Sequence, residues 1–164
     1  MARYFICLFL FAFPPTRFFA FRRKLLKYAG VQIGFDVSVC GHGFIYGRGD
    51  FYIGDGTWLS PGVIVRTHQN AAVKIGRNCD IGPSVDFITG GHEIGSMDRR
   101  AGTGVALPIE VGDGCWIGGR TIILGGVRIG AGSIVAAGSV VTKNVPENVL
   151  VAGVPAQVKK VLDP

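Results

Sequence analysis

The sequence lacks the features of a membrane-spanning or disulfide-bonded protein. Its longest apolar run covers residues 4–13, whereas a helix needs about 20 apolar residues to cross a bilayer. The four cysteines form no CxxC pair and no spacing typical of small secreted domains: Cys7, Cys40, Cys79 and Cys115. We therefore expect buried and reduced thiols, as in cytosolic proteins.

Recognition patterns for nucleic acid and for metal ions are also missing. There is no zinc-finger spacing, no aromatic-basic RNA motif and no helix-turn-helix pattern, so no nucleic-acid partner is expected. His42, His68 and His92 lack the spacing of a three-histidine zinc site, and no metal is expected. The net charge of +6 favours an anionic partner, such as a phosphorylated cofactor or a membrane surface.

Glycine and aliphatic residues, by contrast, are abundant and periodic. There are 26 glycines, and a large apolar residue recurs at every sixth position in five triples. The triples are Ile33, Val39, Ile45; Ile53, Leu59, Val65; Ile75, Ile81, Phe87; Val111, Ile117, Ile123; and Ile129, Val135, Val141. This period matches neither a helix nor a strand. It predicts a three-sided coil of 18 residues, with one apolar side chain per side pointing inward and glycines at crowded corners.

Three insertions interrupt this period, each after the third side of a coil: 51–52, 71–74 and 93–110. Long loops on a rigid scaffold commonly carry function, so the third insertion is the predicted location of the chemistry. The expected organisation is a hydrophobic and basic helical segment at 1–30, a β-helix at 31–146 with its extended loop at 93–110, and a tail at 147–164.

The first thirty residues follow a helical pattern. Phe18, Phe21, Leu25 and Tyr28 recur at helical spacing, and the basic residues between them are Arg22, Arg23, Lys24 and Lys27. Two interpretations stay open and are compatible. The segment caps the end of the repeat, because a solenoid end needs cover, or it lies with its basic residues toward anionic lipid. In the second case residues 4–28 touch the inner face of the membrane of a cytoplasmic protein.

The hexads and two longer stretches resemble a known family. Each hexad tends to read as an aliphatic residue, glycine, two variable residues and a small or β-branched residue; the stretches are ITGGHEIG (88–95) and PIEVGDGCWIGG (108–119). They resemble the hexapeptide-repeat acyltransferases, in the branch that acetylates galactosides, maltose and polysaccharides. The resemblance implies an all-β fold, a left-handed parallel β-helix of about five triangular coils with an N-terminal helical cap. It also implies a homotrimer with active sites between subunits, acetyl-CoA as acyl donor and a saccharide as acceptor.

By the same resemblance, His92 is the general base that takes a proton from the acceptor hydroxyl. Gly119 is the position whose backbone N–H stabilises the oxyanion, where some relatives have serine. The implied CoA-binding residues are Gly119, Ala137, Thr142, Lys143 and Lys160. His68 and Asn70 lie one coil before His92, and two interpretations stay open: they border the acceptor pocket, or they form a solvated turn. Trp116 is expected to pack beside the coil.

The predicted function is acetyl-CoA-dependent O-acetylation of a saccharide during synthesis of a bacterial surface polysaccharide. The apolar and basic N-terminus motivates the polysaccharide, since lipid-linked glycans are assembled at membranes. Two alternatives stay open: N-acetylation of an amino sugar or xenobiotic by the same base, and a β-helix that binds without catalysis.

Overall fold

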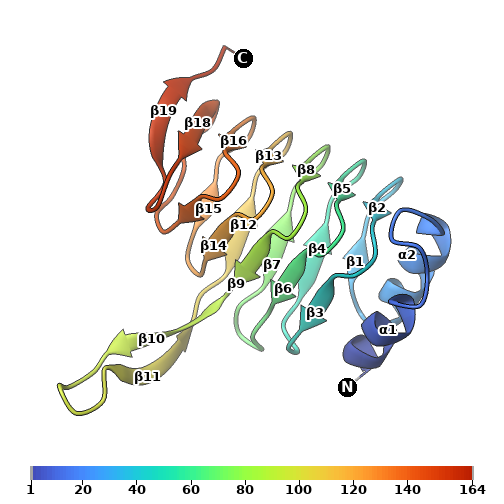
Figure 1. The fold of residues 1–164 in the computed structure, drawn as a ribbon, viewed down its shortest axis with the longest axis horizontal. Coiled ribbons are helices and arrows are strands. Elements are labelled where there is room, and N and C mark those ends of the chain that lie inside the picture. Colours follow the sequence, from blue (N-terminus) through green and yellow to red (C-terminus); the bar gives the residue numbers. More distant parts are fainter. Residues whose placement is uncertain (1, 164) are drawn as a thin grey trace.

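The computed structural model describes residues 2–163 and shows a parallel β-helix with two helices at its N-terminal end (Figure 1). Three sheets form its sides. Sheet 1 contains β1 (Gln32–Ile33), β4 (Phe51–Ile53), β7 (Val73–Ile75), β12 (Ile109–Val111) and β15 (Arg128–Ile129). Sheet 2 contains β2 (Ser38–Val39), β5 (Trp58–Leu59), β8 (Asp80–Ile81), β13 (Trp116–Ile117), β16 (Ile134–Val135), β18 (Val149–Ala152) and β19 (Gln157–Val161). Sheet 3 contains β3 (Phe44–Tyr46), β6 (Ile64–Arg66), β9 (Asp86–Ile88), β14 (Ile122–Leu124) and β17 (Val140–Val141).

The repeated apolar residues form the core of this prism. All fifteen members of the five triples lie in strands and are buried. Equivalent residues pair from coil to coil, as Ile33 does with Ile53 and Ile53 with Ile75. The prediction of stacked, three-sided coils in a mostly β protein is confirmed.

A further inward row was not expected from the hexads. Phe51 pairs with Val73, and Val73 with Ile109, and all three side chains are buried. These residues fall within the three stretches that interrupt the period. Part of each insertion therefore lengthens a strand of sheet 1 and fills the core, instead of leaving the prism as a loop.

The glycine that follows the first apolar residue of a triple allows the coils to approach closely. A Cβ on Gly76 would lie 2.7 Å from the carbonyl carbon of Gly112, and one on Gly54 would lie 2.6 Å from that of Gly76. The left-handed backbone occurs two residues later, at Gly56 (φ 68°) and Asn78 (φ 51°). At each of these corners, the first glycine is required because there is no room for a side chain, and a different residue, two positions later, adopts the positive φ.

We expect Gly76→Ala to lower the free energy of unfolding by about 1–3 kcal/mol, because the added methyl group pushes two coils apart. Gly104→Ala is the control: a Cβ there would meet nothing within 4 Å, and the change should stay below about 0.5 kcal/mol. Urea unfolding followed by circular dichroism measures both values. Equal stability of the two variants would contradict this account.

Helices α1 (Ala2–Leu10) and α2 (Phe19–Tyr28) cover the open end of the first coil (Figure 1). Cys7, Leu10 and Leu26 join the core cluster of the β-helix, so the predicted helical cap is confirmed. The buried side of α2 differs from the predicted one. Arg22 and Leu26 are buried, whereas Tyr28 is 84% exposed.

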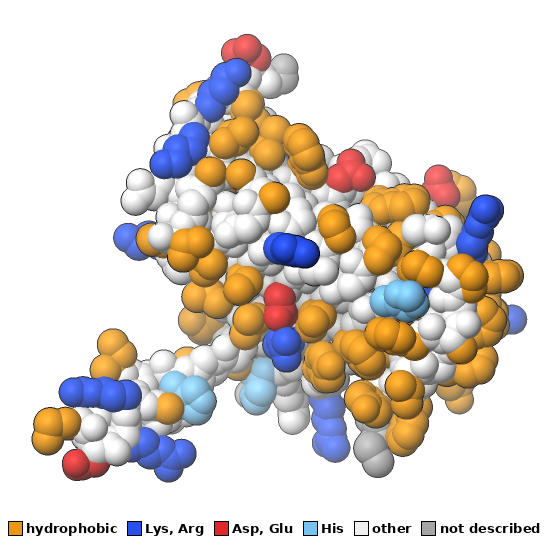
Figure 2. All heavy atoms as spheres, viewed as in Figure 1, with side chains coloured by type: hydrophobic (Ala, Val, Ile, Leu, Met, Phe, Trp, Pro, Cys, Tyr) orange, Lys and Arg blue, Asp and Glu red, His pale blue; other side chains and the backbone are white. Residues whose placement is uncertain are grey.

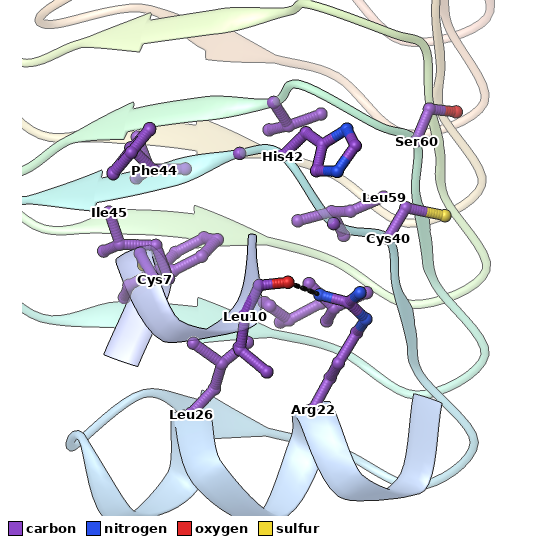
Figure 3. Close-up of a pocket in the computed structure, with 17 residues that line it drawn as sticks. Cys7, Leu10, Arg22, Leu26, Cys40, His42, Phe44, Ile45, Leu59 and Ser60 are labelled. Atoms are coloured by element: carbon purple, nitrogen blue, oxygen red, sulfur yellow. Dashed lines mark hydrogen bonds between the residues drawn. The ribbon is translucent and has the colours of Figure 1, made fainter. Parts of the chain in front are cut away.

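Arg22 links the two helices of the cap. The prediction that its side chain faces solvent or lipid is wrong. The side chain is 1% exposed. Its Nε donates to the carbonyl of Arg17 at 3.1 Å, and its terminal nitrogens donate to the carbonyls of Leu10, Phe13 and Pro14 at 3.4, 3.2 and 3.0 Å. Figure 3 shows the bond to Leu10. Burial lowers the pKa of Arg22. The four acceptors lie at the end of α1 and in the connection to α2, so one guanidinium fixes the helical hairpin.

The coil continues beyond residue 146, into the segment expected as a tail. Val145 bridges Ile129, and β18 pairs with β16 in parallel. Strand β19 then turns back and pairs antiparallel with β18. The last side of the prism is therefore followed by a strand of reversed direction.

The four cysteines are buried and free, as expected. Burial raises the pKa of the Cys7 and Cys40 thiols. Both lie where the cap meets the first coil (Figure 3), so these thiols are protonated packing groups.

Candidate functional site

The third insertion forms an arm of two antiparallel strands, β10 (Gly90–Ile94) and β11 (Ala101–Ala106). It leaves the prism after β9 and returns at β12, which is the corner between sheets 3 and 1. Figure 2 shows the arm standing clear of the body. Ile94 and Met97 near its tip are 91% and 81% exposed. Because a lone two-stranded hairpin is marginally stable in water, this arm is suited to lie against another surface.

His92 lies on β10 at the base of the arm, opposite Gly104. Its Nδ1 is 3.0 Å from the carbonyl oxygen of Gly102. A carbonyl oxygen only accepts hydrogen bonds, so Nδ1 carries the hydrogen and Nε2 keeps its lone pair. The side chain is exposed, and Nε2 can therefore accept a proton from a bound group.

His68 lines the same shallow hollow as His92, together with the glycines at the base of the arm. The backbone N–H of Asn70 donates to Nδ1 of His68 at 3.4 Å. This contact favours the other tautomer, with the hydrogen on Nε2. The hollow thus has an imidazole acceptor and an imidazole donor. Asn70 is exposed at the adjoining turn.

Gly119 and Ala137 lie at a different corner, between sheets 2 and 3. Gly119 follows β13 and Ala137 follows β16 one coil later, and the N–H of Gly138 donates to the Gly119 carbonyl at 2.9 Å. Within residues 2–163, no backbone acceptor takes a hydrogen bond from the Gly119 N–H. A Cβ at this position would lie 3.1 Å from the Pro83 ring, so glycine suits the crowded corner.

Thr142 and Lys143 follow β17, at the corner from which the arm also leaves, and Lys160 lies on β19 opposite Leu150. All three proposed CoA-binding side chains are exposed. One chain therefore groups His92 with His68, and Gly119 with Ala137, but holds these two pairs at different corners of the triangle.

An outward row on sheet 2 was missed from the sequence. Trp58, Asp80 and Trp116 are in register on neighbouring strands, and together with Ser60 and Pro83 they line a shallow groove. Trp116 is 57% exposed on the outer face of sheet 2 in the single chain. The available signal was its place directly before a buried apolar residue, because alternate strand residues face opposite sides.

No group of three or more His, Cys, Asp or Glu side chains in the described part of the chain is arranged to hold a metal ion. His42 instead stacks on Phe11 of the cap, with ring centroids 4.7 Å apart. The chemistry available at the arm is that of an exposed imidazole, without a metal ligand set around it.

Known proteins share the hexapeptide repeat of this chain. Residues 108–143 match the family model described as bacterial transferase hexapeptide (six repeats). Over 124 residues the chain is 34% identical to the galactoside O-acetyltransferase of Escherichia coli (strain K12), a match covering 65% of this chain and 61% of that protein. The chain spans less than two thirds of the length of the curated relatives it matches.

Two solved structures are similar along almost the whole chain. One is a hexapeptide-repeat-containing acetyltransferase of Vibrio cholerae O1 biovar eltor, complexed with acetyl coenzyme A. It is 31% identical with a TM-score of 0.80, covering 98% of this chain and 87% of that one. The other is a galactoside acetyltransferase in complex with coenzyme A, 29% identical with a TM-score of 0.81, covering 97% of this chain and 78% of that one.

Proposed function

Because the chain belongs to the hexapeptide-repeat acetyltransferase family, we propose that it transfers an acetyl group from acetyl-CoA to a hydroxyl group of a saccharide. The observation that carries this proposal is the tautomer of His92, which is set by a backbone carbonyl. Its Nδ1 is held by the Gly102 carbonyl, and Nε2 is left to act as a base at the root of the arm. An imidazole can accept and release protons near neutral pH, as such a reaction requires.

In the proposed reaction, Nε2 of His92 takes the proton of the acceptor hydroxyl while that oxygen attacks the thioester carbonyl carbon. The Gly119 N–H donates a hydrogen bond to the carbonyl oxygen as it becomes negative. The carbon–sulfur bond then breaks, and Nε2 returns the proton to the leaving thiolate. The products are an acetyl ester and free CoA, and His92 ends in its starting state.

In this proposal the two groups come from neighbouring subunits, since one prism keeps them at different corners. We assign a homotrimer, in which a closed ring of three prisms forms three equal clefts. The arm supports this arrangement. Ile94 and Met97 would gain cover against a neighbour, and His92 would be carried toward that neighbour's Gly119.

Acetyl-CoA is a substrate in this proposal, and the exposed residues of the last coils fit its parts. Ala137 is small and leaves room beside Gly119 for the narrow pantetheine chain. Lys143 and Lys160 offer positive charge to the phosphates, although an ammonium group is a looser partner than the fork of an arginine. Thr142 adds a hydroxyl at the same corner as Lys143.

For the acceptor we propose two contact regions. His68 and Asn70 lie at the hollow of His92, where the Nε2–H of His68 can donate to a sugar oxygen. The groove with Trp58 and Trp116 offers flat apolar faces, as small-molecule sites commonly do. The narrower proposal, a saccharide of a bacterial surface polysaccharide, is supported by the apolar and basic N-terminal helices, which suit work beside lipid-linked glycans.

Release of free CoA thiol from acetyl-CoA tests the activity. We expect release that depends on an added saccharide, and a product heavier by one acetyl group in mass spectrometry. Alkaline hydroxylamine, applied to the purified product, removes an ester-linked acetyl group and leaves an amide intact, so it distinguishes O-acetylation from N-acetylation. Absence of both acetyl-CoA binding in calorimetry and thiol release would instead identify a non-catalytic β-helix.

A further inference from the structure

The first 35 residues carry the whole net charge of the molecule. They contain six basic residues and no acidic residue, whereas residues 36–164 contain eleven of each sign. Arg22 is enclosed in the cap, and Arg3 is hydrogen-bonded to the carbonyls of Ala29, Gly30 and Gly49. The other cations of this segment remain at the surface of the helical end.

Helix α1 is apolar except for Arg3, although only one side is covered. Cys7 and Leu10 face the core. Four large side chains on the rest of the helix are 48–58% exposed: Tyr4, Phe5, Leu8 and Phe9. A helix this apolar is normally buried, yet these four side chains are about half exposed in the described chain.

The same surface continues onto α2. Phe9 meets Phe21 edge-on with ring centroids 6.4 Å apart, and Phe13 contacts both Phe18 and Phe21. Figure 2 shows apolar side chains gathered at this end of the molecule. We name as the aromatic face these six exposed residues: Tyr4, Phe5, Leu8, Phe9, Phe18 and Phe21.

Exposed cations border the aromatic face. Arg17 directly precedes Phe18, Lys24 lies one helical turn after Phe21, and Lys27 lies one turn further. Among residues 2–163, none of these three cations takes part in a salt bridge. Apolar side chains flanked by free cations are the combination that an anionic membrane surface binds.

We propose that the aromatic face docks on a bilayer containing anionic lipid, with its apolar side chains at the acyl boundary and Arg17, Lys24 and Lys27 at the lipid phosphates. The helices have nine and ten residues, and the described chain contains no helix long and apolar enough to cross a bilayer. In the proposed complex, α1 and α2 therefore lie parallel to the membrane surface, at the boundary between lipid head groups and acyl chains. A second copy of the chain is a poorer occupant, because it would bring two surfaces of the same positive charge together.

This docking directs the β-helix away from the bilayer, because the cap covers the end of the first coil (Figure 1). The arm leaves after the third coil, which stands two strand spacings, or about 10 Å, beyond the first coil. The hollow at His92 is thereby held within reach of groups attached to lipid. The membrane contact itself does not depend on the proposed acetyl transfer.

Co-sedimentation of the full chain with lipid vesicles tests the proposal. We expect binding to vesicles of equal parts phosphatidylcholine and phosphatidylglycerol, weaker binding at high salt, and little binding to phosphatidylcholine alone. Phe5→Gln combined with Leu8→Gln should lower the apparent affinity about tenfold or more, because two apolar side chains leave the interface. Lys24→Gln combined with Lys27→Gln should lower it about fivefold per lysine, on anionic vesicles only.

Two controls remove matching groups far from the aromatic face. Arg99→Gln with Arg100→Gln, at the tip of the arm, deletes the same amount of charge, and Val161→Gln on β19 deletes an exposed apolar side chain; both variants should bind like the unsubstituted protein. Circular dichroism checks that every variant is folded. Equal binding to both vesicle types, or equal binding by all variants, would overturn the proposal. So would a change in the oligomeric state of lipid-free Phe5→Gln/Leu8→Gln in sedimentation velocity, since the aromatic face would then join subunits.

Discussion

Replacing His92 with alanine should lower kcat by about 10²- to 10⁴-fold, which is the usual contribution of a general base. The variant loses the Nε2 that accepts the hydroxyl proton, while Gly119 and Ala137 remain unchanged at their own corner. The KM for acetyl-CoA should therefore stay close to that of the unsubstituted protein. Saccharide-dependent thiol release measures both parameters.

His42→Ala is the matched control, because it removes a histidine that stacks on Phe11 in the cap instead of lining the arm. Its kcat should be unchanged. Full activity of His92→Ala would reject the assigned mechanism.

Mixed oligomers test whether the site joins two subunits. Ala137→Glu places a bulky, negative group at the exposed corner beside Gly119, and it should block use of acetyl-CoA. When this variant and His92→Ala are coexpressed, some clefts combine an intact His92 with the intact Ala137 of a neighbour. We expect activity to return in these mixtures. Two inactive variants that stay inactive together would contradict the intersubunit site.

Replacing Arg22 with leucine should lower the free energy of unfolding by about 2–4 kcal/mol. Four carbonyls of the cap lose their donor, and a buried acceptor without a partner costs about 1–3 kcal/mol. The total stays below the simple sum, because leucine also removes the cost of burying a cation and because water reaches part of the cap. Urea unfolding measures the difference.

Arg23→Leu is the comparison for this experiment. Arg23 donates one hydrogen bond, to the Val37 carbonyl at 2.7 Å, and it is only partly buried. Its loss should cost about 1 kcal/mol or less. Arg22→Lys should fall between Arg22→Leu and the unsubstituted protein, since an ammonium group keeps the charge without the planar fork. Equal stability of Arg22→Leu and Arg23→Leu would remove Arg22 from its assigned role.

The fold could be predicted to the level of individual core residues, because each coil repeats the same spatial demand at the same spacing. Phe51, Val73 and Ile109 escaped this prediction since they stand in stretches that break the period. Arg22 escaped it for another reason. Its acceptors are backbone carbonyls that the turn between two helices brings together. The pattern of side chains in the sequence does not predict the direction of these carbonyls.

The candidate site was predictable in part. The resemblance selected His92 and Gly119, and the phase of the hexads already implies different corners, because one follows a third side and the other a second side. The tautomer of His92 depends on Gly102 across the arm, a contact that spacing alone does not reveal. The roles of both residues stay predictions until the activity is measured.

The antiparallel strand β19 affects how molecules of this protein can stack end to end. A solenoid whose last parallel coil is open offers its strand edges to the first coil of another molecule, which is a route to fibres. Here helices block one end, and at the other end an antiparallel strand bearing Lys159 and Lys160 lies over the edge of β18. The parallel pairing of sheet 2 thereby ends at β18.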